Sequence, residues 1–307
     1  MSVVKTDVPM TSRLCDEIIR QLTEEYPFLR SQVLTTTAFG RPVRSLVIGS
    51  GERQVLYSAA HHANEWITTP VLLKFAQELA QAIREGGRIY GVPAQTIQRA
   101  ATIHLVPMVD PDGVDLVTGA IQPGTLEYET AARLADGYPQ IPFPEGWKAN
   151  LLGVDLNLQY PAGWLQAREI KFSQGYTRPG PRDYVGRSPL SQRESIALAE
   201  YTEAVDPALV LAYHTQGRVI YWQFRDYEIP EARKYGEEFA RLSGYALEDT
   251  PYESSFAGYK DWFIQNFRRP GYTIEVGNGQ NPLPLSQFDT IYRENLGILV
   301  AAATGLP

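Results

Sequence analysis

The chain has 307 residues, of which 44% are hydrophobic and 21% charged, a composition typical of a globular protein with a sizeable apolar core. Its formal net charge of −7 and its scattered basic residues give no electrostatic case for a nucleic-acid partner. Cys15 is the one cysteine, which excludes an intramolecular disulfide framework and cysteine-rich metal sites.

Apolar periodicity predicts the elements of the first 113 residues. A helical period behind the capping residues Thr11 and Ser12 indicates a first helix, and later alternation indicates strands. In chain order we expect a helix over 12–25, two strands within 31–48 around a turn at 39–42, a strand over 54–60, a helix over 69–84 and a strand over 101–109. This last strand is apolar nearly throughout and is expected to end in a turn over Asp110–Gly113.

Residues 118–190 differ from the rest of the chain because proline and glycine recur throughout them. A loop region of this length inside a compact domain is usually functional or disordered. Large aromatic residues lie between the prolines and glycines, among them Tyr128, Tyr138, Trp147, Tyr160, Trp164 and Tyr176. Because such rings favour packing, we expect this region to be ordered.

Regular periodicity returns after this region. The expected elements are a helix over 191–203, a buried strand over 208–213, a helix over 231–242, a further segment over 259–267, a strand over 272–276 and a helix over 287–303. Apolar strands that alternate with helices predict an α/β fold in which helices cover a largely parallel sheet. Neither a repeat nor a linker divides the chain, so we expect a single domain.

The run His61-His62-Ala63-Asn64-Glu65-Trp66 closes the apolar stretch 55–60. An imidazole and a carboxylate three residues apart, just past a predicted strand, can turn to one side and hold a divalent cation. A catalytic zinc site usually takes three protein ligands and leaves one position for water. The run therefore requires a third ligand elsewhere in the chain.

Two further histidines are available as that ligand. His104 lies in the middle of a predicted strand, where a histidine satisfied within the sheet is the favoured interpretation. His214 instead follows the apolar run 209–213, at the carboxyl end of a buried strand, which is the edge where open α/β sheets bind ligands. His-x-x-Glu followed by a distant histidine, each after an apolar strand, predicts a metal site.

Zinc-dependent hydrolysis also needs a base to move the proton of the attacking water. Glu275 interrupts the otherwise apolar strand 272–276, and a carboxylate in such a position is costly unless it is paired or functional. A structural glutamate paired with an arginine is the alternative, and the residues alone favour neither.

Several motifs together carry a family resemblance. In chain order they are His62–Thr68, Val106–Gly113, Gly153–Asn157, His214 and Thr273–Glu275. In order and spacing they resemble the zinc carboxypeptidase family from about residue 40 to the C-terminus, although the family usually has asparagine at the position of Asp110. The resemblance implies one domain over 1–307, a mixed eight-stranded twisted sheet flanked by helices, with 1–40 as its least covered part.

The same resemblance implies one zinc ion per chain, bound by His62, Glu65 and His214. Glu275 falls on the general base, and Asp155 falls on the carboxylate that orients a ligand histidine and fixes its tautomer. His61 falls outside the ligand set and is expected to be a neighbour.

Two differences from the family concern the substrate. The exopeptidases hold a free C-terminal carboxylate with an Asn-Arg pair, whereas here Asn157 is followed by Leu158, which cannot replace a bidentate guanidinium. The arginine that assists the carbonyl is matched by Lys148, which can still stabilise an oxyanion as a point charge. We expect Asn157 to contact substrate and Lys148 to assist catalysis.

Two residues are expected to face the substrate from the later part of the chain. Lys260 precedes Asp261-Trp262 and falls on the family's specificity position, where its ammonium would favour a side chain that ends in a carboxylate. A solvated lysine on a helix face is the alternative interpretation. Tyr252 lies near the position of the family's mobile tyrosine and is expected to contact substrate.

Leu158 and Gln159 before Tyr160-Pro161 resemble a bacterial branch of the family, the γ-D-glutamyl-diamino-acid endopeptidases. The resemblance implies cleavage of peptidoglycan peptides between D-Glu and meso-diaminopimelate, a residue whose side chain also ends in a carboxylate. A zinc-dependent deacylase of N-acyl amino acids, a metallocarboxypeptidase of ordinary peptides and a catalytically silent binding protein are the alternatives. A serine hydrolase and a zincin are disfavoured by the absence of their motifs.

Nothing in the sequence indicates a membrane location. No stretch approaches the length of a membrane span, and residues 1–13 lack the apolar core of a signal peptide. We therefore expect a cytoplasmic protein that acts on small soluble muropeptides, although a leader removed beforehand would leave the same sequence. The oligomeric state is left open.

Overall fold

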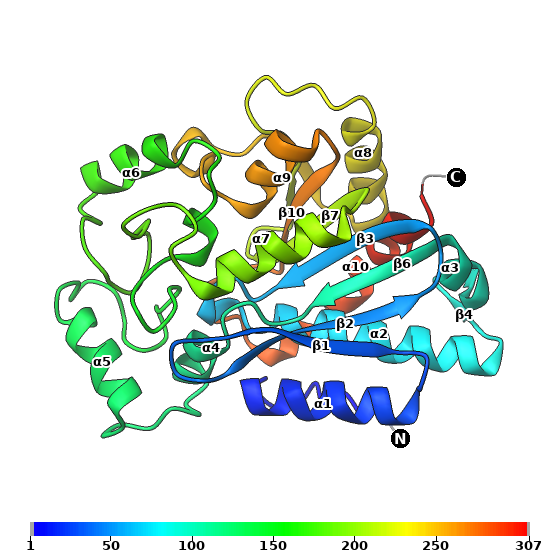
Figure 1. Cartoon of the computed structure of the whole chain (residues 1–307), viewed down its shortest axis with the longest axis horizontal. Coiled ribbons are helices and arrows are strands. Elements are labelled where there is room, and N and C mark those ends of the chain that lie inside the picture. Colours follow the sequence, from blue (N-terminus) through cyan, green and yellow to red (C-terminus); the bar gives the residue numbers. More distant parts are fainter. Residues whose placement is uncertain (1–2, 306–307) are drawn as a thin grey trace.

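A mixed eight-stranded sheet organises the computed structural model, which describes residues 3–305 (Figure 1). Its spatial order is β1-β2-β6-β3-β7-β10-β8-β9. The strands are β1 (Arg30–Thr36), β2 (Pro42–Gly49), β3 (Arg53–Ala59), β6 (Ala101–Val106), β7 (Leu209–Thr215), β8 (Val219–Tyr221), β9 (Ala246–Glu248) and β10 (Gly271–Val276). The central strands β6, β3, β7 and β10 are parallel, whereas the pairs β1–β2, β2–β6 and β10–β8 are antiparallel, and β9 pairs parallel with β8. The predicted mixed sheet is therefore confirmed.

Helices cover both faces of this sheet. One face carries α1 (Ser12–Glu25), α2 (Thr68–Glu85), α3 (Ala94–Ala100), α8 (Ala232–Ser243) and α10 (Phe288–Thr304), and the other carries α7 (Arg193–Val205) and α9 (Tyr259–Phe267). The alternation of side chains along a strand divides the apolar residues between two cores. On β3, Val55 and Tyr57 lie in the first core, and Leu56 lies in the second.

Residues 118–190 are ordered, as their aromatic residues predict, but they also contain helices that their composition does not indicate. These are α5 (Leu126–Ala135), the short 3-10 helix η2 (Leu156–Leu158) and α6 (Trp164–Ser173). Trp147, which is fully buried, forms a small third core there with apolar neighbours such as Leu151. The region curls over one edge of the sheet, where the strands of the centre end (Figure 1).

The predicted turn over 110–113 is wrong, because these residues begin the helix α4 (Pro111–Val117). Asp110 caps the helix by accepting a hydrogen bond from the Gly113 N–H. Pro111 occupies the first helical position, where no hydrogen bond within the helix requires a backbone N–H. The strand before it ends at Val106 rather than 109. Asp-Pro is typical of a turn, and it is equally typical of the start of a helix.

Several short elements were also missed. They are the short strands β8 and β9, the helix α3, and the two-stranded ribbon of β4 (Arg88–Ile89) and β5 (Val92–Pro93). Strands of two or three residues carry too little alternation to be recognised. None of the helices within residues 3–305 is long and apolar enough to cross a membrane, and the cytoplasmic location stays a prediction.

Glu194 on α7 gives a testable pH dependence of stability. Burial raises the pKa of this carboxyl, which is 3% exposed, to about 7, and nearby Asp112 adds to the effect. The folded state therefore keeps a proton that the unfolded chain releases, so the contribution to stability is full below pH 4.5 and is lost as the pH rises through 7. We expect Glu194→Gln to raise the free energy of unfolding by about 2 kcal/mol at pH 8 and much less at pH 5.

Urea denaturation of the two proteins at pH 5 and pH 8 measures this difference. Glu203→Gln, an exposed site on the same helix, is the matched control and should show no such pH dependence. An equal gain for Glu194→Gln at both pH values would contradict the assignment of the buried proton to Glu194.

Candidate active site

Two adjacent parallel strands bring the histidine and glutamate motifs together. His62 and Glu65 follow β3 in a turn that contains the 3-10 helix η1 (Ala63–Glu65), and His214 lies near the end of β7, the neighbour of β3. The Thr68 hydroxyl fixes this turn by donating to the Glu65 carbonyl and accepting from the Ala60 N–H. The carboxyl ends of β3 and β7 therefore present the three side chains at one edge of the sheet.

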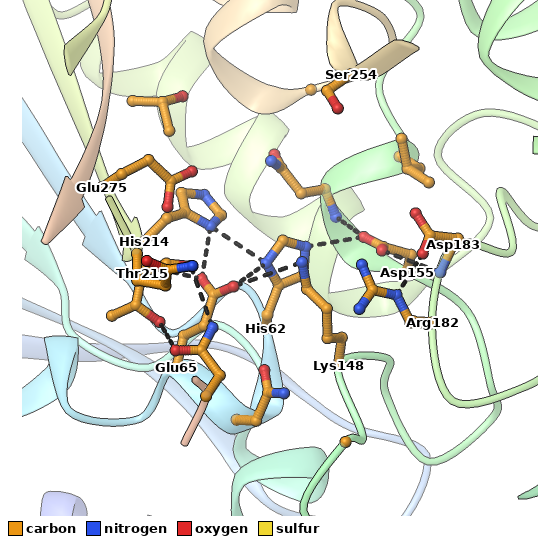
Figure 2. A pocket seen from close by; sticks show the side chains of 18 of the residues that line it. His62, Glu65, Lys148, Asp155, Arg182, Asp183, His214, Thr215, Ser254 and Glu275 are labelled. Atoms are coloured by element: carbon orange, nitrogen blue, oxygen red, sulfur yellow. Dashed lines mark hydrogen bonds and ion pairs between the residues drawn. The ribbon is translucent and has the colours of Figure 1, made fainter. Parts of the chain in front are cut away.

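Their potential ligand atoms converge on one point, within 4.8 Å of one another (Figure 2). His62 Nδ1 lies 2.9 Å from Glu65 Oε1, His214 Nδ1 lies 2.9 Å from Glu65 Oε2, and the two Nδ1 atoms are 3.2 Å apart. All three side chains are buried. Two imidazoles and a carboxylate are a common ligand set for catalytic zinc.

The tautomer of His62 tests whether these residues fit a metal ion. Its Nε2 lies 3.1 Å from Asp155 Oδ1, and donation of the Nε2 proton to this carboxylate leaves a lone pair on Nδ1. That lone pair faces a carboxylate oxygen of Glu65 at 2.9 Å, an unfavourable contact unless a cation or a proton lies between them. The arrangement therefore fits a divalent cation.

The local electrostatics favour positive charge at the same point. Burial alone would lower the pKa of His62, but the Glu65 and Asp155 carboxylates raise it to about 9. Conversely, the neighbouring His62 and Lys148 hold the pKa of Glu65 well below its usual range despite its burial. A bound cation would balance the negative charge of these carboxylates, which a protonated His62 otherwise balances.

Glu275 lies beside this cluster on β10, where it pairs in register with His214 of β7. Its side chain lines a cavity of about 620 Å³ together with the three candidate ligands, and Figure 2 shows it next to His214. Burial and the Glu65 charge raise its pKa to about 8. Within residues 3–305 it makes no ion pair with an arginine, so the structural alternative from the sequence lacks support.

Lys148 and Asp155 enter the cavity from the region over 118–190. Lys148 Nζ lies 3.5 Å from Glu65 Oε1, and its backbone N–H donates to the Pro181 carbonyl. The His62 imidazole lowers the pKa of Asp155 against the effect of burial, so this carboxylate stays ionised. Both residues therefore lie beside the candidate ligands, and their roles stay predictions.

Three of the expected substrate contacts lie in different environments. Asn157 lines the cavity, and its Oδ1 accepts from the Tyr259 N–H. Lys260 also lines it, but its ammonium donates to the Gln223 carbonyl and to Asp261, so it is not a solvated surface lysine. Tyr252 is 70% exposed and packs on Phe256 outside the cavity lining.

The other two histidines, His61 and His104, lie outside the candidate ligand group and have partners within the protein. His61 accepts or donates one hydrogen bond with Ser58 at 2.8 Å and stacks on His214, with its ring centroid 5.0 Å away. His104 bonds Tyr201 and Gln54, and burial lowers its pKa to about 4. His104 is thus satisfied in the middle of β6, and it does not belong to the cluster at the carboxyl ends of β3 and β7.

Four further residues of the candidate site were not predicted from the sequence. The Thr215 N–H donates to Glu65 Oε2 at 3.2 Å, and Lys171, Arg182 and Asp183 line the cavity beside Asp155. No motif marks the last three, because Lys171 is on α6 and the other two lie in an irregular loop. Adjacent Arg182-Asp183 between two prolines and a tyrosine was the one available signal.

Comparison with known proteins assigns the chain to a family. The zinc carboxypeptidase family matches residues 15–297. The gamma-D-glutamyl-L-diamino acid endopeptidase 1 of Lysinibacillus sphaericus is 46% identical over 92% of this chain and 69% of its own length. The uncharacterized protein YqgT of Bacillus subtilis strain 168 is 38% identical over 92% of this chain and 73% of its own length.

Solved structures show the same fold at low sequence identity. The bovine thrombin-activatable fibrinolysis inhibitor superposes with a TM-score of 0.74 at 16% identity, covering 97% of each chain. The carboxypeptidase A of Helicoverpa armigera gives 0.71 at 18% identity, covering 98% of this chain and 75% of its own.

The chain belongs to the zinc carboxypeptidase family. It is accordingly a zinc-dependent hydrolase with the α/β fold of that family. The resemblance predicted from its motifs is confirmed.

Proposed function

We propose that the protein hydrolyses the amide bond between the γ-carboxyl of D-glutamate and meso-diaminopimelate in peptidoglycan-derived peptides. The observation that carries this proposal is the 46% identity to the gamma-D-glutamyl-L-diamino acid endopeptidase 1. The reaction adds water to the γ-carbonyl carbon and breaks its bond to nitrogen, which yields a γ-carboxylate and the free amine of diaminopimelate.

In this proposal His62, Glu65 and His214 hold one zinc ion, which when bound polarises the amide carbonyl and lowers the pKa of water to about 7. Glu275 accepts the proton of the attacking water and returns it to the leaving amine, because its carboxylate faces the same cavity. Lys148 supports the negative charge that develops on the carbonyl oxygen, and Asp155 holds the His62 ring.

The substrate wall on α9 is suited to the far end of meso-diaminopimelate. That end carries both an ammonium and a carboxylate. Lys260 and Asp261, which form an ion pair in the cavity lining, offer the complementary charges: Lys260 for the carboxylate and Asp261 for the ammonium. Lys260 Nζ uses two donors within the protein, on the Gln223 carbonyl and Asp261, which leaves a third for a substrate carboxylate. A zwitterionic end fits this neutral pair better than a purely acidic side chain does.

Leu158 supports cleavage within a chain rather than at its end. It is 8% exposed and lines the cavity beside Asn157, where a guanidinium would otherwise bind a free C-terminal carboxylate. Because no guanidinium at this position requires a free C-terminal carboxylate, a substrate that continues past diaminopimelate loses no interaction here. The small peptide substrate is therefore expected to be accepted with or without a further residue.

Digestion of two defined peptides tests the proposal. Zinc-loaded protein is incubated with L-Ala-γ-D-Glu-meso-diaminopimelate, with and without a terminal D-Ala, and the products are identified by mass spectrometry. We expect L-Ala-D-Glu from both peptides. Release of D-Ala alone would instead indicate a carboxypeptidase, and cleavage only of simple N-acyl amino acids would indicate a deacylase.

A further inference from the structure

A cluster of Lys171, Arg182 and Asp183 on the cavity wall carries an excess positive charge. Lys171 Nζ lies 2.8 Å from Asp183 Oδ1, and Arg182 Nε lies 2.5 Å from Asp183 Oδ2. One carboxylate is therefore shared by two cations, so the cluster has a net charge of about +1. All three residues line the cavity that contains the candidate metal ligands.

Arg182 presents this excess charge to the cavity. The Lys171 side chain is 11% exposed, whereas that of Arg182 is 40% exposed. Arg182 bonds Asp183 through Nε, and its two terminal nitrogens meet no hydrogen-bond partner among residues 3–305. These nitrogens form the planar fork that binds a carboxylate through two parallel hydrogen bonds.

The surroundings fix Arg182 relative to the reaction centre. The Asp183 N–H donates to Asp155 Oδ2 at 3.3 Å, and Asp155 Oδ1 accepts from His62. Figure 2 shows Arg182 on the same side of His62 as Asp155, whereas Glu275 lies on the other side.

We propose that Arg182 binds the free α-carboxylate of the D-glutamyl residue and so selects γ-glutamyl substrates over their α-carboxamide analogues. This inference rests on the proposed function. In a γ-linked glutamyl residue the side-chain carbonyl is attacked, and the α-carboxylate remains free three carbons away. Lys148 serves the carbonyl and Lys260 lies on a different wall, beside Gln223, so Arg182 is the cation left for this group.

Paired substrates test the assignment. Values of kcat/KM are measured for L-Ala-γ-D-Glu-meso-diaminopimelate and for the same peptide with the glutamyl α-carboxylate converted to a carboxamide. We expect the zinc-loaded wild type to prefer the carboxylate by roughly 10- to 100-fold, as for a charge-assisted pair, and Arg182→Gln to lose this preference. Arg182→Lys should retain part of it, because the charge remains and the fork is lost.

Two variants and one binding measurement separate recognition from a structural effect. Arg187→Gln changes an exposed arginine of the same loop that does not line the cavity, and it should keep the wild-type preference. Lys260→Ala should weaken diaminopimelate relative to lysine in the next position, yet leave the carboxylate preference unchanged. Calorimetric binding of both peptides to Glu275→Gln should show the same preference without turnover.

The outcomes distinguish this inference from the proposed function. Equal cleavage of the two peptides by the wild type at the γ-glutamyl bond would overturn the role of Arg182 and leave the function standing. A carboxylate preference that persists in Arg182→Gln would do the same. Cleavage of neither peptide would overturn the function and the inference together.

Discussion

Glu275→Gln should lower kcat on the γ-glutamyl peptide by roughly 10²- to 10⁴-fold while zinc content stays that of the wild type. The amide has nearly the shape of the carboxylate but cannot accept the proton of the attacking water. Glu275 is outside the group of atoms that converge on the candidate metal position, so its replacement leaves the three ligands in place. Steady-state kinetics and elemental analysis of zinc measure the two quantities.

Two comparisons make this result specific. Glu52→Gln, an exposed site in the turn before β3, should leave both kcat and zinc content unchanged. If Glu275→Gln kept most of the wild-type kcat, Glu275 would not be the base. If it lost zinc as well as activity, its carboxylate would belong to the metal site instead.

The sequence predicted the centre of the site because its residues lie at the ends of apolar strands. His62 and Glu65 follow one such strand, and His214 and Glu275 lie in two others. Parallel strands in one sheet place their carboxyl ends along a common edge, so the position of these residues in the chain already implies their proximity. The mixed sheet itself, however, followed from the family resemblance and not from the alternation of apolar residues.

The wall of the cavity could not be predicted in the same way. Arg182 and Asp183 lie in an irregular loop, and their contacts with Asp155 and Lys171 join residues that no periodic element relates. The neutralising partner of Lys260 was equally hidden, because adjacent Lys-Asp residues on a helix usually point to solvent. Here α9 buries both side chains against the cavity, with Lys260 3% exposed. Such tertiary contacts determine charge compensation, and local sequence does not encode them.

The start of α4 and the short strand β8 could not be predicted for a related reason. Asp110-Pro111 suits a turn or a helix N-terminus, and only the hydrogen bond from Gly113 selects the helix. Strand β8 has three residues and is held by its pairing with β10 rather than by its own pattern. Yet β8 matters to the site, because Tyr221 at its end lines the cavity.

His214→Ala should reduce zinc affinity far more than any change outside the ligand set. The variant loses one of the three candidate ligands and leaves His62 and Glu65 as the other two. We expect more than the roughly 10- to 100-fold loss that is typical when a group that only orients a ligand is removed. Zinc content after dialysis against a competing chelator measures the affinity, and Asp155→Asn provides the milder reference.

Thermal unfolding provides a second measure that does not depend on activity. Zinc binds the folded protein, so added zinc should raise the Tm of the metal-free wild type and leave that of His214→Ala nearly unchanged. His104→Ala is the matched control, since this histidine bonds Tyr201 and Gln54 within the sheet and should keep the wild-type response. Full zinc occupancy in His214→Ala would mean that another residue supplies the third ligand. Because the potential ligand atoms of His62, Glu65 and His214 all lie within 4.8 Å of one another, the expected result is a loss of zinc together with a loss of zinc-dependent stabilisation.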